Sequence, residues 1–327
     1  MHAPLVSINI VSFNTKDITL DALRSIERSV RVAWLTSHPT DDIEIVVVDN
    51  ASTDGSVAEL ESYAKTCPFA MRVIALGENI GFGRGHNRAA AESRGEILLL
   101  LNTDTICTRD ALNALTKRFL EYNPPTLEQY RDLISDKSNG IRVHFLGPKL
   151  LNADMTAQPS CGPYYSIPTI IGALFLRGDH WSLTRQSPTT HTQVDWVSGA
   201  AFMCKRADFT ELGGFDEKIF MYMEEIDLHY RARKKGMNVW FTPDAQIVHL
   251  GSASSNKRYP IFQVYRGFLY LYSKHHSRQS LYVVQSILWV KAALVIALAR
   301  LLRKPSLLET YTEAQAIVRE FSSTRQT

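Results

Sequence analysis

The first 120 residues alternate short apolar runs with segments suited to helices. The apolar runs cover residues 6–13, 43–49, 71–76 and 96–101, and the first is short and β-branched, which suits a buried strand. The segments 17–34, 56–65 and 83–93 lie between the runs and are predicted to be helices. Strands separated by helices indicate βαβ units, so we expect an α/β fold built on a mostly parallel sheet.

Polar residues directly follow each of the four apolar runs. They are Asn14 after Phe13, the pair Asp49-Asn50, the pair Glu78-Asn79, and the tripeptide Asn102-Thr103-Asp104. Ligands of parallel sheets bind at the carboxyl ends of the strands. Four polar strand ends in succession therefore predict one binding site rather than four unrelated turns.

A second block of the chain extends the sheet. Residues 122–140 are polar, contain Pro124-Pro125 and are predicted to be a loop. Strand-like runs follow at 143–151, 199–204 and 239–241, and a helix is predicted over 224–235.

The C-terminal region has a different composition. Residues 259–272 are aromatic and basic, and residues 281–302 are strongly apolar with Lys291 in the middle. A central lysine is costly in a membrane-spanning helix, which argues against a span. Two alternatives remain open: a core helix, or an amphipathic helix that makes peripheral membrane contact through residues 258–304.

Composition narrows the class of protein. The 327 residues are 45% hydrophobic with a formal charge of +3, so no nucleic-acid partner is implied. The four cysteines show no CxxC spacing, which disfavours a disulfide framework and fits a reducing compartment. The N-terminal residues show no secretory signal pattern, and we expect a cytoplasmic protein.

Two candidate ligand-binding segments lie in the first half. Asp49 ends an apolar run and could accept hydrogen bonds from a pyrimidine imide or a ribose hydroxyl, or it could cap the turn that leads to Ser56 as a helix N-cap. In the segment 79–87 the glycines allow close backbone approach, and Arg84 could meet a phosphate. A dinucleotide fingerprint is excluded there, since His86 occupies the place of the third glycine.

Asp104 and His249 are candidate metal ligands. Asp104 follows four leucines and offers the hard oxygen that a divalent cation bridging a diphosphate requires. The alternative is a helix N-cap at Thr105 or Thr108 with Asp104 in the turn. His249 ends an apolar run, where a structural histidine is the alternative to a ligand.

Three acids within four residues, Glu224, Glu225 and Asp227, begin the predicted helix 224–235. Acids at a helix start are favoured by the helix dipole, which is one explanation for them. The other is a general base facing an acceptor hydroxyl, with a pKa raised by the local charge density.

Together these segments resemble the family 2 glycosyltransferases, in particular the rhamnosyltransferase-like branch, over residues 6 to about 254. The stretches that carry the resemblance are SINIVSFNT, VVVDNASTDGS, NIGFGRGHNRA, LLLLNTDT, LGPKLLNADMTAQPS, VDWVSGAAFMCKR and LGGFDEKIFMYMEEIDLHYRARKKG.

The resemblance implies a GT-A fold over residues 1–255, with a nucleotide-binding half at 1–120, an acceptor half at 141–255, and a helical C-terminal region at 256–327. It implies inversion at the anomeric carbon by direct displacement. It places Phe13, Asn14 and Asp49 by the nucleoside, Asn79 and Arg84 near the donor, Asn102 and Asp104 in the DxD segment, and Trp196 at the sugar. Asp104 and His249 would hold Mg²⁺ or Mn²⁺, and Glu225 occupies the position of the catalytic aspartate.

Two departures from the family pattern keep alternatives open. The first acid of DxD is Asn102, and the usual Glu-Asp pair is Glu224-Glu225, so Glu224 or Asp227 could be the base instead. The resemblance implies a nucleotide-sugar donor, best matched by dTDP-rhamnose, and a saccharide or lipid-linked acceptor at the inner face of the plasma membrane. The absence of QxxRW favours single additions. A catalytically weak scaffold in a membrane-associated assembly complex is the alternative function.

Overall fold

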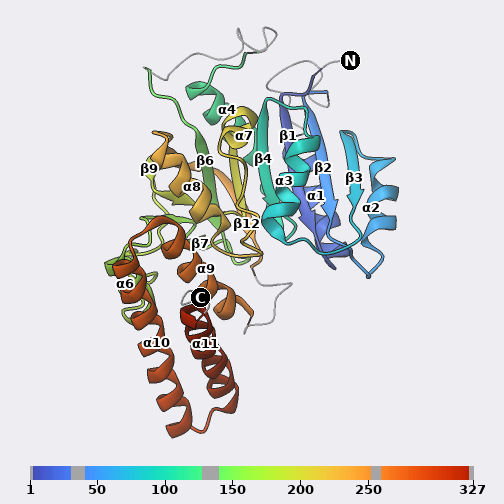
Figure 1. Cartoon of the computed structure of the whole chain (residues 1–327). Coiled ribbons are helices and arrows are strands. Elements are labelled where there is room, and N and C mark those ends of the chain that lie inside the picture. Colours follow the sequence, from blue (N-terminus) through green and yellow to red (C-terminus); the bar gives the residue numbers. More distant parts are fainter. Residues whose placement is uncertain (1–2, 31–40, 127–139, 252–258, 324–327) are drawn as a thin grey trace. The chain divides into compact units, whose positions relative to one another are not determined.

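The computed structural model describes residues 3–30, 41–126, 140–251 and 259–323 (Figure 1). The chain divides into two compact units. Unit 1 comprises Met1–Pro163, Arg185–Phe220 and Glu224–Ser254, and unit 2 comprises Tyr164–Thr184, Met221–Met223 and Ser255–Thr327.

Unit 1 is built on a ten-stranded sheet with strand order β3-β2-β1-β4-β11-β6-β12-β5, in which β7 pairs with β6 and β9 with β12. Its strands are β1 (Val6–Ser12), β2 (Ile43–Asp49), β3 (Ala70–Ala75), β4 (Ile97–Asn102), β5 (Thr105–Cys107), β6 (Phe145–Leu151), β7 (Ala157–Gln158), β9 (Thr192–Val194), β11 (Ala201–Lys205) and β12 (Val239–His249). Strands β3, β2, β1 and β4 are parallel, and β11 joins β4 antiparallel. A separate two-stranded sheet pairs β8 (Cys161–Gly162) with β10 (Trp196–Val197).

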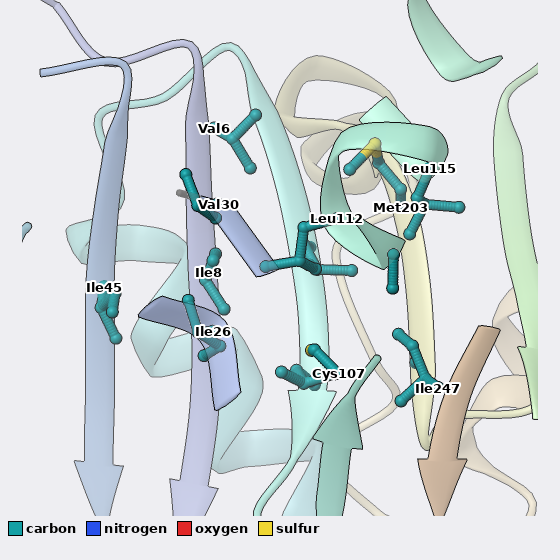
Figure 2. Close-up of a cluster of buried hydrophobic side chains, with 14 of the residues drawn as sticks. Val6, Ile8, Ile26, Val30, Ile45, Cys107, Leu112, Leu115, Met203 and Ile247 are labelled. Atoms are coloured by element: carbon teal, nitrogen blue, oxygen red, sulfur yellow. The ribbon is translucent and has the colours of Figure 1, made fainter. Parts of the chain in front are cut away.

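The alternation along β4 explains why its four leucines are all buried. Ile97, Leu99 and Leu101 belong to a core cluster with residues of α1 (Lys16–Val30) and α4 (Ala111–Tyr122), part of which Figure 2 shows. Leu98 and Leu100 belong to a second cluster with residues of α7 (Arg206–Glu211) and α8 (Glu224–Lys234). Because successive strand residues face opposite sides, a strand covered on both faces has a continuous apolar run.

Both faces of β2 are covered in the same way. Ile45 and Val47 lie in the cluster with α1, whereas Val46 and Val48 pack with Ala89 of α3 (Phe82–Glu92). The remaining helix of this half is α2 (Ser56–Ala64). The predicted α/β fold with a mostly parallel central sheet flanked by helices is therefore confirmed.

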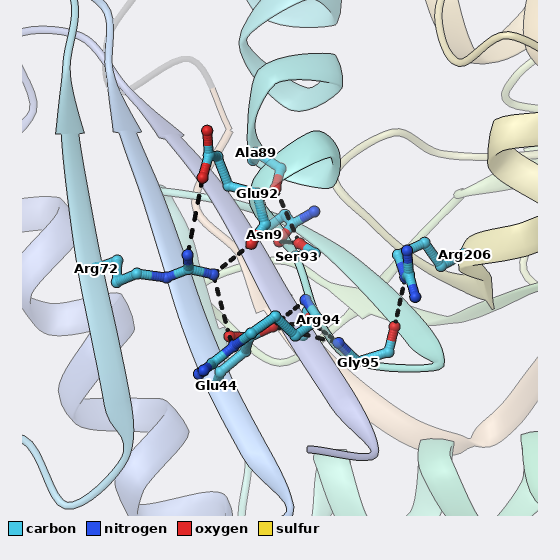
Figure 3. A network of polar contacts seen from close by, with 10 residues as sticks. Asn9, Glu44, Arg72, Ala89, Glu92, Ser93, Arg94, Gly95 and Arg206 are labelled. Atoms are coloured by element: carbon cyan, nitrogen blue, oxygen red, sulfur yellow. Dashed lines mark hydrogen bonds and ion pairs between the residues drawn. The ribbon is translucent and has the colours of Figure 1, made fainter. Parts of the chain in front are cut away.

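A buried carboxylate of β2 binds donors from neighbouring segments at the end of the sheet opposite the polar strand ends. Glu44, at the start of β2, accepts hydrogen bonds from the Ser7 hydroxyl at 2.6 Å and from the Arg94 and Gly95 amides (Figure 3). It also pairs with the guanidinium groups of Arg94 at 3.0 Å and Arg72 at 3.2 Å. Its carboxylate is therefore surrounded by donors from β1, β3 and the turn before β4.

Two local predictions differ from the structure, and parts of two others are not described by it. Ser56 is not the N-cap of α2, because Gly55 holds that position with a φ of 84° and Asp54 accepts the hydrogen bond from the Ser56 amide. The helix α4 was not predicted, and neither Thr105 nor Thr108 caps it: Thr105 lies in β5, and the Thr108 hydroxyl donates to the Gln246 carbonyl oxygen. Of the predicted helix 17–34, residues 31–34 lie outside the described residues, as do residues 127–139 of the predicted loop.

Unit 2 is helical. It contains α6 (Ile167–Phe175), α9 (Tyr259–His275), α10 (Arg278–Leu301) and α11 (Pro305–Ser323), and α10 contacts the other three. The predicted helical C-terminal extension is confirmed. Residues 164–184 join this unit because α6 packs on α10, where the Lys291 ammonium donates to the Leu174 carbonyl oxygen at 2.6 Å. Among the described helices, α10 is one that is long and apolar enough, by length and composition alone, to cross a membrane.

Candidate active site

The register of the parallel strands aligns the polar strand ends at one edge of the sheet. Ser12 at the end of β1 pairs with Asp49 at the end of β2, and Val11 pairs with Asn102 at the end of β4. Asp49 in turn pairs with Ala75 at the end of β3. The backbone pairing therefore confirms the prediction that these strand ends lie at one edge of the sheet.

The loops after β1 and β2 are tied to each other. Asn14 has a φ of 53°, and its side-chain oxygen accepts the Thr53 amide at 2.8 Å while its own amide donates to the Ser52 hydroxyl at 2.8 Å. Asp49 is fully buried and accepts both the amide and the hydroxyl of Ser52, at 2.8 and 2.7 Å. Phe13 stays 44% exposed beside this braced turn, which leaves its ring free to contact a ligand.

A second set of bonds fixes the start of α3. The Asn79 side-chain oxygen accepts the Gly81 amide at 3.0 Å, and the Gly81 carbonyl accepts the Asn50 side-chain amide at 3.2 Å. Gly81 has a φ of 91°, and a Cβ there would lie 2.6 Å from the Phe220 carbonyl oxygen, so no other residue fits. Arg84, in the first turn of α3, donates to the Glu217 carbonyl oxygen at 2.9 Å.

Asp104 and His249 lie together although they are 145 positions apart in the sequence. The His249 Nε2 is 3.3 Å from the Asp104 Oδ1, and the Leu250 amide donates to the Asp104 carbonyl oxygen at 2.9 Å. The antiparallel pairing of β12 with β5, which sets His249 opposite Thr105, produces this approach.

Gln158 orients the His249 ring and was not predicted. Its side-chain oxygen lies 2.7 Å from the His249 Nδ1, and its side-chain nitrogen donates to the Asn152 oxygen and to the His249 carbonyl. With Nδ1–H donating to Gln158, the ring turns Nε2 toward the Asp104 carboxylate, in the orientation that a metal ligand needs. The stretch that contains Gln158 was part of the resemblance, but nothing in the sequence pointed to its contact with a residue 91 positions away.

Asn102 connects this pair to the acidic start of α8. Its backbone amide donates to the Ala200 carbonyl oxygen at 2.9 Å, whereas its side-chain oxygen is buried and has no hydrogen-bond partner. Next to Ala200, a Cβ on Gly199 would lie 3.6 Å from the Glu225 Cβ, and the Gly199 amide donates to the Glu225 carboxyl. Asp104 and Asn102 are two residues apart in the chain, and the segment 199–200 contacts Asn102 on one side and Glu225 on the other.

Burial changes the charge state of the two glutamates that begin α8. Glu224 is 6% exposed with its Oε2 unpartnered, and burial together with the Glu225 carboxylate raises its pKa well above the ordinary value. Burial also raises the pKa of Glu225, which the Arg185 guanidinium and the Gly199 amide counteract in part. Glu225 is only partly buried, so it remains open to solvent, as a group that exchanges protons with a ligand must be.

Asp227 and Trp196 are both buried within unit 1. Asp227 is fully buried and pairs with the Arg231 guanidinium at 2.7 Å, and Arg231 also donates to the Leu212 and Gly214 carbonyls. A buried, ion-paired carboxylate cannot reach an acceptor, so this geometry does not favour Asp227 as the base. Trp196 is 1% exposed and donates to the Pro163 carbonyl at 2.8 Å, so its ring is core, with the exposed Arg185 guanidinium 5.6 Å from the ring centroid.

The described residues contain no cluster of three or more His, Cys, Asp or Glu side chains suited to a metal ion. The groups that could hold a cation are the Asp104 carboxylate, the His249 Nε2 and the unpartnered Asn102 oxygen. Carboxylate and amide oxygens suit Mg²⁺ and Mn²⁺, and imidazole is tolerated by Mn²⁺. A lone pair that faces a carboxylate is also unfavourable until a cation or proton lies between them, so the residues fit a divalent ion.

Comparison with solved structures supports the fold. The chain is similar to a mannosyltransferase from Pyrobaculum calidifontis, whose structure holds GDP-mannose and Mn²⁺ (TM-score 0.55, 17% identity, 98% of this chain and 86% of that one). It is also similar to TarS of Staphylococcus aureus (TM-score 0.51, 15% identity, 98% and 91%). The predicted GT-A fold is confirmed.

Sequence comparison gives the family. The chain is 26% identical to an N-acetylglucosaminyl-diphospho-decaprenol L-rhamnosyltransferase of Mycobacterium tuberculosis, over 66% of this chain and 69% of that one. It is 26% identical to the rhamnosyltransferase WbbL of Escherichia coli, over 52% and 60%. The family model described as glycosyl transferase family 2 matches residues 7–176, which is more than half of the chain. This protein is therefore a glycosyltransferase and belongs to glycosyl transferase family 2.

Proposed function

We propose that this enzyme is an inverting, metal-dependent transferase that moves rhamnose from dTDP-rhamnose to a hydroxyl of a saccharide or lipid-linked acceptor in bacterial surface polysaccharide synthesis. The named rhamnosyltransferases among its relatives support the donor sugar. The observation that carries the proposal is the pairing of Asp104 with His249, two residues after Asn102, whose partner segment 199–200 contacts the half-buried Glu225.

Asp104, His249 and the Asn102 oxygen are proposed to hold Mg²⁺ or Mn²⁺. When bound, the ion would neutralise negative charge on the diphosphate of the donor. Gln158 keeps the His249 lone pair directed at the site, so loss of that amide should weaken metal binding without removing a ligand.

On the donor side, the turn braced by Asn14 and Asp49 presents Phe13 and the loop amides to the nucleoside. Asp49 acts through Ser52, whose backbone it fixes, since its own carboxylate is buried. Asn79 fixes the Gly81 turn at the start of α3, whose first-turn amides favour an anion, and Arg84 is proposed to meet the donor phosphates there. Trp196 is proposed to shape the sugar pocket from the core rather than by direct contact.

Glu225 is proposed to be the general base. Its carboxylate takes the proton of the acceptor hydroxyl while that oxygen forms a bond to the anomeric carbon. The bond between the anomeric carbon and the diphosphate oxygen breaks at the same time, and the nucleoside diphosphate leaves with the electron pair. A pKa raised toward the working pH makes Glu225 a stronger base than an ordinary carboxylate. Glu224 remains the alternative base, with its carboxyl more deeply buried.

A thermal-shift and turnover panel tests this function. The protein is heated with dTDP-rhamnose, UDP-galactofuranose, GDP-mannose and UDP-glucose, each with and without Mn²⁺, and hydrolysis of each donor is measured. We expect the melting temperature to rise most with dTDP-rhamnose plus Mn²⁺, because a ligand that binds only the folded state stabilises it. The Asp104→Ala variant should lose the Mn²⁺-dependent part of the shift while its unliganded melting temperature stays within a few degrees.

Other outcomes decide against the proposal. A larger shift with another donor would reassign the sugar, and an unchanged Mn²⁺ response in Asp104→Ala would remove Asp104 from the metal site. No shift and no hydrolysis with any donor would favour the catalytically weak scaffold. The inner face of the plasma membrane is the proposed location, because a lipid-linked acceptor would be met there.

A further inference from the structure

The outer face of α10 in unit 2 carries no charge along most of its length. The buried side of the helix, which includes Leu281, Leu288 and Ile296, packs within the unit. Between positions 282 and 298 the exposed residues are Tyr282, Val283, Ser286, Trp289, Val290, Leu294, Ala297 and Leu298. A helix on the surface of a water-soluble domain is expected to be polar on that side. We call this row of exposed side chains the α10 stripe.

The one cation in the middle of α10 is bound inside the unit. The Lys291 ammonium donates to the Leu174 carbonyl oxygen at 2.6 Å and lies 5.4 Å from the centroid of the Phe175 ring. Leu174 belongs to the last turn of α6, where carbonyl groups lack helical partners and a cation is favourable. Lys291 therefore does not interrupt the α10 stripe.

Exposed apolar residues also occur on α6, which packs against α10, and on the segment after it. Phe175, Leu176, Trp181 and Leu183 are all exposed, with Trp181 at 67%. Exposed aromatic residues with an apolar body and a polar edge are typical of the boundary between lipid headgroups and acyl chains.

Basic residues border this apolar surface at both ends of α10. Arg278 lies at the start of the helix, and Arg300, Arg303 and Lys304 lie at its end; all four are exposed. Arg177 is also exposed on the segment after α6, where Asp179 is the acid and accepts the Thr184 hydroxyl. The exposed side of α11, by contrast, carries Glu309, Glu313 and Glu320 together with Arg319.

We propose that the α10 stripe and the exposed residues of α6 are a docking surface for an anionic membrane, on which the helix lies in the plane of the headgroups. The basic ends of α10 complement lipid phosphates, and the apolar stripe replaces contacts between water and acyl chains. A spanning orientation is disfavoured, because α11 packs on the other side of α10 and would carry its exposed carboxylates into hydrocarbon. Pairing of two α10 stripes is disfavoured as well, because either alignment brings basic ends together.

Flotation of the full chain with vesicles tests the surface. Vesicles of phosphatidylcholine alone and of phosphatidylcholine with phosphatidylglycerol are used as probes. We expect flotation with the mixed vesicles, weakened about tenfold or more by Trp289→Glu with Leu294→Glu, since two charges enter the apolar layer. The matched control is Ile141→Glu with Met155→Glu in unit 1, whose side chains are 45% and 57% exposed against 42% and 56% for Trp289 and Leu294. The control pair should float like the wild type.

Two further sets of variants test the basic residues and the insertion of Trp289 into the lipid layer. Arg300→Ser with Arg303→Ser and Lys304→Ser should remove the preference for the anionic vesicles. Trp289→Phe, which keeps the apolar surface intact, should retain flotation but reduce the quenching of tryptophan emission by brominated acyl chains. The proposal fails if neither vesicle binds the wild type, or if both glutamate pairs weaken flotation equally. It also fails if light scattering shows a dimer that Trp289→Glu with Leu294→Glu dissociates while vesicles have no effect, because the surface then joins two copies.

Discussion

Glu44 and Glu224 are both buried in unit 1, yet their surroundings drive their charge in opposite directions. Burial alone raises the pKa of Glu44, but the Ser7 hydroxyl, the Arg94 amide and the Arg94 guanidinium outweigh it, and the net pKa is lowered. Glu224 has burial and a neighbouring carboxylate and too few donors, so its pKa is raised well above the usual value. A buried acid stabilises a fold only where donors surround it.

The two positions therefore separate a structural acid surrounded by donors from an acid that we propose to be part of the active site. The donors to Glu44 come from β1, β3 and the turn before β4, and its loss should be felt by the fold (Figure 3). Burial of the Glu224-Glu225 pair destabilises the folded state, and destabilising arrangements of this kind are concentrated at catalytic sites. Tyr222 and Met223, directly before this pair, have positive φ values of 66° and 75°, which adds local backbone strain at the same place.

The largest expected effect is the loss of transfer when Glu225, the proposed base beside Glu224, is replaced. Glu225→Gln should lower transfer about 10²- to 10⁴-fold, because the amide cannot accept the acceptor proton. The melting temperature should not fall, since a neutral amide replaces a carboxyl whose pKa is raised by burial. Transfer rates and thermal unfolding of the same preparation measure both. Glu61→Gln, at an exposed position of α2, is the control, and a wild-type rate in Glu225→Gln would shift the base role to Glu224.

Replacement of Glu44 should have the reverse effect: it should lower stability and leave the transfer rate nearly unchanged. Glu44→Gln should lower the free energy of unfolding by about 2–4 kcal/mol. The reason is that the backbone amides and the two arginine guanidinium groups around position 44 lose the buried carboxylate to which they donate. The rate per folded molecule should stay near that of the wild type. Urea unfolding gives the free energy, and a loss of activity without a loss of stability would contradict the division between the two glutamates.

Asp227 sharpens the comparison within α8 itself. Asp227→Asn should cost about 1–3 kcal/mol of stability, because the buried charge-assisted bond from Arg231 is weakened. Transfer by the folded fraction should fall far less than in Glu225→Gln. Urea titration with parallel rate measurements tests this, and a loss of rate equal to that of Glu225→Gln would return Asp227 to the candidate bases.

The smallest expected effect is a pair of opposite pH slopes. The lowered pKa of Glu44 adds stability above its ordinary value of 4.5, which is lost as the pH falls through the folded-state pKa. The raised pKa of Glu224 has the opposite sign: its favourable contribution is complete below 4.5 and is lost as the pH rises toward the folded-state value. Urea midpoints across pH should therefore lose the acid-side slope in Glu44→Gln and the alkaline-side slope in Glu224→Gln. Unchanged slopes in both variants would contradict the two charge states.

The sequence was sufficient to predict most of the sheet and the edge at which the polar strand ends align. Continuous apolar runs such as 97–101 require burial on both faces, and a polar residue after such a run marks a strand end. The short strands were missed, because β7, β8 and β10 have two residues each and no periodicity to detect. The helix α4 was missed because Asp110 begins it in a left-handed conformation, with a φ of 63° and no capping bond from its side chain.

The sequence by itself determined the α/β class, the order of the polar strand ends and the set of acids from which a base and a metal ligand could come. Only the tertiary structure decided which of them lie together: it set His249 against Asp104, placed Gln158 at the His249 ring, paired Asp227 with Arg231 and left the Glu224 Oε2 without a hydrogen-bond partner. The reason is physical. Strand and helix periodicity depend on neighbours along the chain, whereas the charge state of a carboxylate depends on donors that arrive through space from distant residues.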